Sequence, residues 1–274
     1  MTFPDAPRID VTGKTRVMFI IGDPVDHILG TRILNAAWAE QGRDLITVPL
    51  HVPPENLAHA LDMIRKYPNI AGTGITIPHK IAATDLVDHL TDAAAHAGAV
   101  NFIRRNDDAS LTGHNVDGTG FLSGLLSHGV DPAGRSIALA GAGGVARAIA
   151  FALAGAGADA LFIRNRDHLK AQALAAEIRG WKGAAGCTVT AGRPSGNADI
   201  LVNATSLGMR ETDPLPFDRA EIRAGIVTAE VVMTPAITPF MAEAARKGGT
   251  IVPGRAMMDP QAALVAQFLD GNPA

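Results

Sequence analysis

The chain has 274 residues, of which 47% are hydrophobic and 19% are charged, and its formal net charge is -3. This balance is typical of a folded globular protein and excludes an intrinsically disordered chain. Charges of both signs are spread along the sequence, so no basic patch predicts a nucleic-acid surface. Cys187 is the only cysteine, which excludes an internal disulfide and fits a reducing compartment.

The hydrophobic stretches predict neither membrane insertion nor export. The longest of them, residues 136–163, is interrupted by glycines and by Arg147, whereas a membrane span needs about 20 consecutive apolar residues. The N-terminal segment lacks the apolar run of a signal peptide between a basic start and a small-residue cleavage site. We therefore expect a cytoplasmic protein that binds a small molecule and neither membranes nor nucleic acids.

The first part of the chain alternates predicted strands and helices. We expect strands at residues 16–22, 45–52 and 70–78, helices at 32–42, 54–67, 80–90 and 92–99, and a short hairpin-like pair at 99–106 and 111–117. Such alternation indicates βαβ units and a mostly parallel sheet. Right-handed crossovers then place the carboxyl ends of the parallel strands at one edge, where α/β proteins bind ligands.

A second α/β run begins near Gly120. We expect helices at residues 121–129, 143–157, 167–180 and 259–271, and strands at 136–142, 159–165, 198–205, 226–232 and 249–254. The two runs meet around residues 118–120, where glycines offer a hinge. The predicted fold class is α/β with two α/β domains, the second of Rossmann type.

A glycine-rich turn in the second run predicts a dinucleotide site. Gly141, Gly143 and Ala146 form a G-x-G-x-x-A pattern between an apolar strand and a helix. Gly141 permits a tight turn, Gly143 lets a pyrophosphate approach the backbone, and Ala146 lets helix and strand pack closely. The helix N-terminus supplies free N–H groups for the phosphates. The alternative is an ordinary turn in a chain rich in glycine and alanine.

The end of the following strand distinguishes NADP from NAD. An NAD site usually places Asp or Glu there to bind the ribose 2′-hydroxyl, whereas this chain has Asn165 and Arg166, with Lys170 one helical turn further. A guanidinium can bind the 2′-phosphate of NADP in a bidentate manner. Asp167 opposes this, because it would repel a phosphate or neutralise Arg166. NADP is the expected cofactor, and NAD is less favoured.

Lys80 follows the predicted buried strand of "GITIPHK" almost at once, since Pro78 cannot continue the ladder. It is either a solvated loop charge or a proton-transfer group at the carboxyl edge of a sheet. Histidines are scattered without metal-ligand spacing, so we expect no metal site.

Specific motifs occur in order along the chain: "GDPVDHILGTRILN", "GITIPHK", "GAVN", "NVDGTGF", "GAGGVARA", "NRD", "DILVNATSLGM" and "GRAMMDPQA". In these motifs the chain resembles the shikimate dehydrogenase family over nearly its whole length. The resemblance implies a substrate domain at 1–118, an NADP domain at 119–254 and a C-terminal helix, 255–274, that returns to the first domain. It also implies hydride transfer in the cleft between the domains. We expect a monomer or a homodimer.

The resemblance assigns roles to individual residues. Lys80 and Asp117 match the family's catalytic pair, which would move a proton to or from the alcohol whose carbon exchanges hydride. Positions that match substrate contacts are Thr76, Asn101 and Gln261, of which Asn101 could equally be a turn residue. Positions that match cofactor contacts are Gly141, Ala142, Gly143, Gly144, Val145, Asn165, Arg166, Lys170, Asn203, Thr205, Ser206 and Gly254, although "NATSLG" could be a turn without a ligand.

The chain departs from the family at the end that binds the substrate carboxylate. The family's two serines are Ile28 and Gly30, a following proline is Thr31, and a late tyrosine is Met233. Other departures are Gly74 for Asn, Phe102 for Thr and Val116 for Thr. An unpaired, partly desolvated carboxylate costs at least about 1–3 kcal/mol. Arg32 and His27 are candidate replacement contacts for an anion, and Arg32 could equally be solvated.

We therefore expect an NADP-dependent oxidoreductase of a cyclic polyol or hydroxy acid with altered substrate specificity. One alternative is a genuine shikimate or quinate dehydrogenase in which other residues bind the carboxylate. Another is a regulatory protein that binds a dinucleotide without catalysis. Retention of Lys80 together with Asp117 argues against the regulatory alternative.

Overall fold

The structure of the protein is a computed structural model that describes residues 10–26, 28, 30–194 and 197–272. The chain divides into two compact units. Unit 1 comprises residues 1–116 and 262–274, and unit 2 comprises residues 117–261. The resemblance places the corresponding divisions after residues 118 and 254, so the second observed division lies later in the chain.

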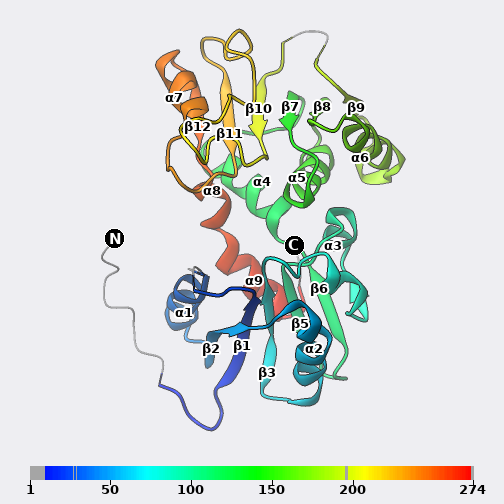
Figure 1. The fold of residues 1–274 in the computed structure, drawn as a ribbon, viewed down its shortest axis with the longest axis vertical. Helices are drawn as coiled ribbons and strands as arrows, with labels where there is room; N and C mark the ends of the chain where they lie inside the picture. The colour runs from blue at the N-terminus through cyan, green and yellow to red at the C-terminus, as the bar shows by residue number, and fades with distance from the viewer. Residues whose placement is uncertain (1–9, 27, 29, 195–196, 273–274) are drawn as a thin grey trace. The chain divides into compact units, whose positions relative to one another are not determined.

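The described part of unit 1 contains a mixed sheet with the strand order β2-β1-β3-β5-β6-β4 (Figure 1). β1 pairs in parallel with β2 and β3, and β4 with β6, whereas β5 is antiparallel to β3 and β6. The predicted hairpin is therefore the β5–β6 pair, and the α/β prediction for this unit is confirmed. The strands are β1 (Arg16–Gly22), β2 (Leu45–His51), β3 (Ile70–Ile75), β4 (His89–Leu90), β5 (Phe102–Arg105) and β6 (Leu111–His114).

Helices cover both faces of this sheet, and β1 shows why. Its successive side chains alternate, so Met18 and Ile20 pack with α1 (Gly30–Glu40) and α9 (Gln261–Leu269), while Ile21 packs with α2 (Leu57–Lys66). Trp38 of α1 is fully buried, and its Nε1 donates to Thr47 Oγ1 at 2.8 Å. Each such buried side chain contributes about 1.5–3 kcal/mol.

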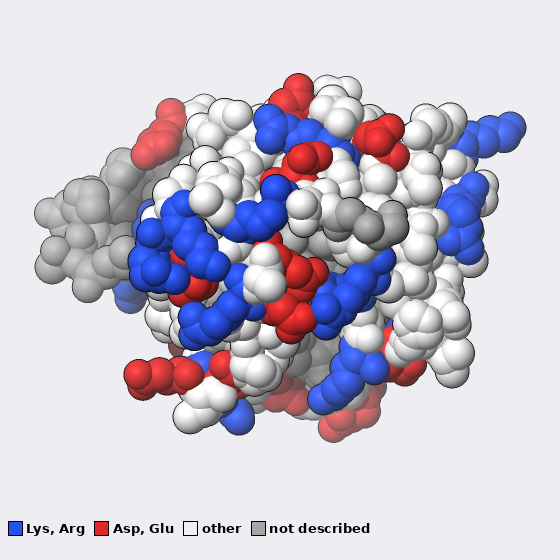
Figure 2. All heavy atoms as spheres, turned by 90° about the horizontal axis from the view of Figure 1, so that it is seen from above, with Lys and Arg blue, Asp and Glu red and all other residues white. Residues whose placement is uncertain are grey.

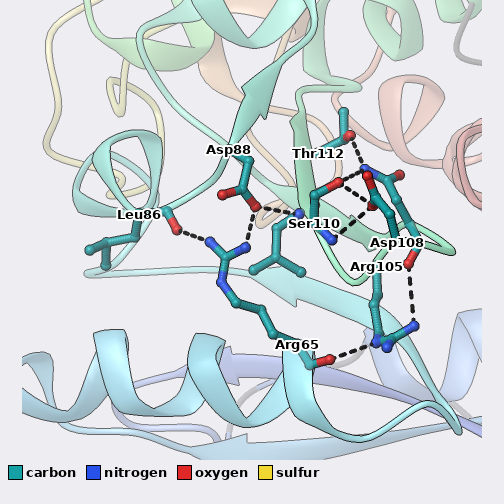
Figure 3. A network of polar contacts seen from close by, with 9 residues as sticks. Arg65, Leu86, Asp88, Arg105, Asp108, Ser110 and Thr112 are labelled. Carbon is teal, nitrogen blue, oxygen red and sulfur yellow. Dashed lines mark hydrogen bonds and ion pairs between the residues drawn. The ribbon is translucent and has the colours of Figure 1, made fainter.

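The predicted helix at residues 80–90 is wrong. Ala82–Asp85 forms a single 3₁₀ turn, η2, and β4 follows it, while the next predicted helix is present as α3 (Asp92–Ala97). The Asp88 carboxylate accepts a hydrogen bond from the Leu111 N–H at 2.6 Å and pairs with Arg65 of α2 (Figure 3). These partners come from other elements, so tertiary contacts override the local apolar pattern.

The described part of unit 2 contains a parallel sheet with the order β12-β11-β10-β7-β8-β9 (Figure 1). This arrangement confirms the Rossmann-type prediction. The strand order reverses between β7 and β10, and such a switch point opens a crevice at the carboxyl ends of the strands. The strands are β7 (Ser136–Ala140), β8 (Ala160–Arg164), β9 (Thr188–Ala191), β10 (Ile200–Asn203), β11 (Val227–Glu230) and β12 (Thr250–Val252).

Two apolar cores fill the faces of the second sheet. Fully buried Ile137 and Leu139 of β7 pack in one core, while Ala138 between them packs in the other. The sequence analysis missed β9 and α7, although Thr238 and Pro239 mark the start of α7 clearly. The helical segments are α4 (Asp117–Ser127), α5 (Gly144–Gly155), α6 (His168–Gly180), η3 (Lys182–Ala184), α7 (Pro239–Arg246) and α8 (Arg255–Met258).

Opposite charges lie side by side on the surface. Glu243 of α7 pairs with Arg219, Arg246 and Lys247 at 2.8–3.3 Å. Figure 2 shows one face on which basic side chains lie around acidic ones. Exposed pairs of this kind contribute little to stability because solvent screens them, so the apolar cores carry most of it. Among the described residues, no helix is long and apolar enough to cross a membrane.

Candidate functional site

Gly141, in the loop after β7, packs against the loop after β10. Its φ of 122° is a left-handed conformation that disfavours a side chain. A Cβ at this position would lie 2.7 Å from the carbonyl oxygen of Ala204 and 3.2 Å from the Cβ of Ala146. Ala146 of α5 is itself fully buried. The small residues of the G-x-G-x-x-A pattern therefore let these three segments pack in direct contact.

Gly143 faces open space instead. No atom lies within 4 Å of its Cβ position, and as the N-cap of α5 it supplies no capping side chain. The first N–H groups of a helix have no partner within the helix, and the helix dipole makes this end positive. The segment from Ala142 to Val145 thus leaves room for a pyrophosphate at a helix N-terminus. These residues fit the dinucleotide that the sequence predicts.

A pocket of about 230 Å³ lies between this loop and the end of β8. Its lining includes Gly143, Asn165, Arg166 and Lys170, so the structure brings the predicted phosphate-binding residues together. In the described part of the chain, the side chains of Arg166 and Lys170 make no ion pair. Both cationic groups are therefore available to an anion.

Asp167 does not neutralise these cations. Its Oδ1 accepts hydrogen bonds from the backbone N–H groups of Leu169 at 3.1 Å and Lys170 at 3.4 Å. Asp167 is thus the N-cap of α6, where a carboxylate is stabilised by the helix dipole. Its Oδ1 bonds its own helix, so Asp167 does not neutralise Arg166, although Asp167 also lines the pocket and its charge still opposes a phosphate there.

A larger cavity of about 410 Å³ opens at the carboxyl ends of β7, β8 and β10. Predicted cofactor residues Arg166, Thr205 and Ser206 line it. Two further arginines in its lining were missed, although Arg164 directly precedes Asn165 in the sequence. Arg164 pairs with Glu221 at 3.1 Å and its guanidinium lies 4.3 Å from the Phe217 ring centre. Arg193 pairs with Asp218 at 2.6 Å.

The "NATSLG" segment is a hydrogen-bonded turn that presents Ser206. Asn203 is fully buried, and its Oδ1 accepts from Thr205 Oγ1 at 2.6 Å while its Nδ2 donates to the Leu207 carbonyl at 2.9 Å. Asn203 and Thr205 therefore shape the turn, whereas Ser206 is exposed at the cavity. The turn and the ligand interpretations of this segment are compatible.

Close packing, which the sequence did not reveal, explains why residue 254 is a glycine. A Cβ there would lie 2.2 Å from the carbonyl oxygen of Val232, so the chain passes too close for any side chain. This contact holds the end of β12 against the segment after β11. Met233, at the position of the family's tyrosine, is 47% exposed. Neither residue is placed against a ligand by these contacts, and their roles remain predictions.

In unit 1, three predicted residues meet at the carboxyl end of β3. The Lys80 carbonyl accepts from the Val100 N–H at 2.8 Å, and the Asn101 carbonyl accepts from the Ile75 N–H at 2.8 Å. Thr76 follows β3 directly. These backbone bonds hold the segments that carry Thr76, Lys80 and Asn101 side by side.

His79 holds the segment that carries Lys80 in place. It is buried, with 1% exposure, and its Nε2 lies 2.7 Å from the Val52 carbonyl oxygen, which accepts a hydrogen bond from the ring. Its backbone N–H donates to the Thr76 carbonyl at 2.9 Å. The sequence analysis noted His79 only as a neighbour of Lys80. The half-buried Lys80 therefore lies on a fixed turn and not on a loose loop.

The Asn101 side chain is buried and has a defined partner. Its Oδ1 accepts from the Val116 N–H at 3.1 Å. This bond fixes the chain immediately before Asp117, which is the first residue of α4 and is buried. Gln261, the last residue of unit 2, has its Cγ 3.8 Å from the Cβ position of Gly120 in α4.

Ile28 and Gly30, which the sequence predicts to replace the family's serines, lie among apolar side chains. The Cβ position of Gly22 is 2.6 Å from Thr76 Cγ2 and 3.7 Å from Ile28 Cδ1. The Cβ position of Gly30 is 3.1 Å from Ile20 Cδ1 and 3.9 Å from Ile28 Cγ2. Ile28 thus lies beside the predicted substrate residue Thr76. Arg32 is exposed on α1, and His27 lies outside the described residues.

Gly74 and Phe102 extend this cluster along the sheet. A Cβ at Gly74 would lie 3.3 Å from both Phe102 Cε1 and Ile20 Cγ1. Phe102 therefore lies close to the place where the family has an asparagine side chain. We call Ile20, Ile28 and Phe102, with the glycines between them, the apolar cluster.

Known protein families match both the segment that carries the predicted substrate residues and the segment that carries the predicted cofactor residues. Residues 20–103 match the family model described as the shikimate dehydrogenase substrate binding domain, and residues 127–209 match shikimate / quinate 5-dehydrogenase. Shikimate dehydrogenase (NADP(+)) of Rubrobacter xylanophilus is 42% identical over 255 residues, which cover 92% of this chain and 89% of the relative. The chain belongs to the shikimate dehydrogenase family. It is therefore an oxidoreductase that acts on CH–OH groups with a nicotinamide dinucleotide, NADP in the curated relatives.

Solved structures of family members superpose along nearly the whole chain. Shikimate 5-dehydrogenase of Listeria monocytogenes, in complex with shikimate and NAD, has a TM-score of 0.86 and 28% identity, and the match covers 96% of this chain and 94% of that one. The 5-ketofructose reductase of Gluconobacter sp. strain CHM43 has a TM-score of 0.84 and 31% identity, with 94% of each chain covered. Membership of this family favours catalysis over the regulatory alternative.

Substitution by alanine should have different effects at Gly141 and at Gly143. Gly141→Ala should lower the free energy of unfolding by about 1–3 kcal/mol, because its left-handed φ and its contact with Ala204 exclude a Cβ. Gly143→Ala should change it by about 0.5 kcal/mol or less, yet weaken dinucleotide binding, because its Cβ would enter the open space at the helix N-terminus. Denaturant unfolding and cofactor titration of the two variants measure both effects. Equal losses of stability would contradict this division of roles.

Proposed function

We propose that the protein is an NADP-dependent oxidoreductase that transfers a hydride between the nicotinamide and a ring hydroxyl or ketone of a small cyclic molecule. The observation that carries the proposal is the pocket that joins the open N-terminus of α5 to Arg166 and Lys170, which make no ion pair with any described residue. It offers N–H groups for a pyrophosphate and two cations for a further phosphate. NADPH, when bound, supplies the hydride.

The preference for NADP over NAD rests on the end of β8. An aspartate or glutamate at that place would bind a free ribose 2′-hydroxyl, whereas Asn165 and Arg166 suit a 2′-phosphate. Because Asp167 caps α6, its carboxylate makes no ion pair with Arg166 in the part of the chain that the structure describes. Some relatives have structures with NAD bound, such as the Listeria enzyme, so the preference needs a direct test.

Arg166→Ala tests this preference. We expect the KM for NADPH to rise about 10- to 100-fold, the effect of losing one charge-assisted hydrogen-bonding group, with little change in the KM for NADH. Steady-state kinetics with the two cofactors provide the measurement, and Arg219→Ala, which removes an arginine that is paired with Glu243, is the matched control. A loss of the same size for NADPH and NADH would refute the assignment of the 2′-phosphate.

For the proton transfer we propose Lys80 and Asp117. Lys80 would exchange a proton with the reacting oxygen, and Asp117 would orient the amine and stabilise its charged form. Thr76, Asn101 and Gln261 would hold the neighbouring hydroxyls of the substrate. Support comes from the fixed turn that carries Lys80 and from the bond between Asn101 and Val116, which immediately precedes Asp117.

Lys80→Ala should lower kcat by at least about 10²-fold, the usual contribution of a positioned acid or base. The affinity for NADPH should stay within about twofold, because the dinucleotide residues lie in unit 2. Turnover assays, together with NADPH binding followed by fluorescence, separate the two effects. A variant with normal turnover would remove Lys80 from the mechanism.

The relatives favour shikimate as the substrate. Proteins that are 42%, 40% and 39% identical to this chain are named shikimate dehydrogenase (NADP(+)). In this candidate function, residues other than the family's serines bind the carboxylate, and Arg32 near the start of α1 is one candidate. Quinate belongs to the same substrate class, and quinate dehydrogenase of Corynebacterium glutamicum has a TM-score of 0.82 and 28% identity.

The apolar cluster favours a second candidate, a cyclic polyol or ketone without a carboxylate. A carboxylate beside Ile28 and Phe102 would lose hydration without gaining hydrogen bonds from those side chains. The 31% identity to a 5-ketofructose reductase adds support, since the substrate in that name is a keto sugar.

One panel separates the two candidates. Shikimate, quinate, carboxylate-free cyclic polyols and 5-ketofructose are compared by NADPH absorbance. Shikimate as the substrate predicts a kcat/KM of about 10⁴ M⁻¹s⁻¹ or more, within the usual enzyme range. The second candidate predicts a value at least about 100-fold lower than for the best carboxylate-free compound. In that case the double variant Ile28→Ser, Gly30→Ser should raise activity on shikimate about tenfold or more, while wild-type preference for shikimate would exclude this candidate.

A further inference from the structure

Arg193 lies beside the predicted cofactor residues, yet neither the sequence patterns nor the resemblance gives it a role. It follows β9 by two residues, and β9 pairs in parallel with β8. The Gly192 N–H donates to the Ile163 carbonyl at 2.8 Å, so the chain directly before Arg193 is held against the end of β8. Arg193 and Arg166 therefore follow neighbouring strands at the same edge of the sheet, and both line the cavity of about 410 Å³.

The lining of this cavity is more basic than that of the smaller pocket. It contains Arg164, Arg166 and Arg193 and, among the described residues, no acidic one. The smaller pocket is lined by Arg166 and Lys170 together with Asp167, whose charge opposes an anion. Since Arg166 lines both, a phosphate bound to its guanidinium meets the more positive surroundings on the side of the larger cavity.

Arg164 is committed to contacts within the protein. Its Nη1 donates to both carboxylate oxygens of Glu221 at 3.1 Å, and its guanidinium lies 4.3 Å from the Phe217 ring centre. Its side chain is only 15% exposed. The charge of Arg164 is therefore compensated by a partly buried ion pair, which leaves Arg166 and Arg193 as the candidate ligands of an anion in this cavity.

The ion pair of Arg193 is of a different kind. Its Nη1 donates to Asp218 Oδ2 at 2.6 Å, but the two side chains are 64% and 59% exposed. Solvent screens such a pair, so it contributes little to stability. Arg193 can therefore exchange Asp218 for an anion of higher charge at small cost.

The 2′-phosphate of NADP is an anion of that kind. A phosphate monoester carries about 1.5–2 negative charges near neutral pH, so a single guanidinium does not compensate it. Each guanidinium can offer two parallel N–H groups to phosphate oxygens. Arg166 and Arg193 at one cavity together match both the charge and the number of acceptors.

We propose that Arg193 is a specificity-determining residue for NADP, which exchanges Asp218 for the 2′-phosphate and binds it together with Arg166. The inference rests on the proposed function, because it takes the cavity beside Arg166 as the place of the 2′-phosphate. Asp218 holds Arg193 when the cofactor is absent and competes with the phosphate for it. Ligands that lack the 2′-phosphate gain nothing from Arg193.

Two ligands that differ only in the 2′-phosphate, 2′-phospho-ADP-ribose and ADP-ribose, test the proposal by calorimetric titration of the whole chain. Arg193→Ala should weaken binding of 2′-phospho-ADP-ribose about 5- to 30-fold, the effect of losing one exposed charge-assisted contact, and leave ADP-ribose within about twofold. Arg193→Lys, which keeps the charge without the planar fork, should recover part of the loss. Because the side chain is exposed, the Tm of these variants should stay close to that of the wild type.

Arg219→Ala is the matched control, because Arg219 is also an exposed, paired arginine but lines neither pocket. It should change the affinity for neither ligand.

Asp218→Asn has the opposite expected effect. Removing the competing carboxylate should strengthen binding of 2′-phospho-ADP-ribose about two- to fivefold, since the exposed pair no longer has to be broken. In the double variant with Arg193→Ala this gain should disappear. A general change of charge would instead give the same gain in both backgrounds, and that result, or no gain in either, would overturn the exchange.

The same titrations separate this proposal from the proposed function. A wild type that prefers 2′-phospho-ADP-ribose, with the whole preference kept in Arg193→Ala, would overturn the role of Arg193 and leave the preference for NADP intact. A wild type that binds both ligands equally well would defeat the preference for NADP and, with it, this proposal.

Discussion

Unit 2 depends on the contact of Gly141 with the main chain of Ala204. A Cβ on Gly141 would lie 2.7 Å from the Ala204 carbonyl oxygen, so the loops after β7 and β10 approach as closely as backbones can. These two strands flank the point where the strand order reverses. The contact brings these two loops together at the crevice, directly before the open Gly143 and the N-terminus of α5. The predicted cofactor residues are therefore built on a close approach of two backbones.

A similar principle operates in unit 1, where backbone hydrogen bonds position side chains that carry the chemistry. Val100 bonds the Lys80 carbonyl, Ile75 bonds the Asn101 carbonyl, and Asn101 in turn bonds the Val116 N–H. The segment of the predicted proton-transfer lysine and the residue before the predicted carboxylate are thus held by backbone hydrogen bonds and by the Asn101 side chain. Bonds of this kind fix a segment without relying on long flexible side chains.

Local patterns predict much of this molecule because strand and helix periods are clear and the glycine pattern lies between a strand and a helix. The cap at Asp167 has a local cause too, although it was not predicted, whereas Gly141 also contacts Ala204 in a distant loop. The errors arise where distant residues decide the outcome. The segment at residues 80–90 is apolar enough for a helix, yet Asp88 is held by Arg65 and Leu111. Likewise the burial of Glu230, the last residue of β11, depends on strands and a helix that no local window contains.

The residues predicted to depart from the family in the substrate half contact one another. Phe102 lies 3.3 Å from the Cβ position of Gly74, so a larger side chain at either residue would displace the other. Ile20 touches the Cβ positions of both Gly30 and Gly74, and Ile28 lies beside Gly30. A single hydroxyl introduced at one of these positions would therefore lie among apolar side chains and lack a hydrogen-bond partner. These side chains therefore constrain one another in size, whether the carboxylate is bound elsewhere or is absent from the substrate.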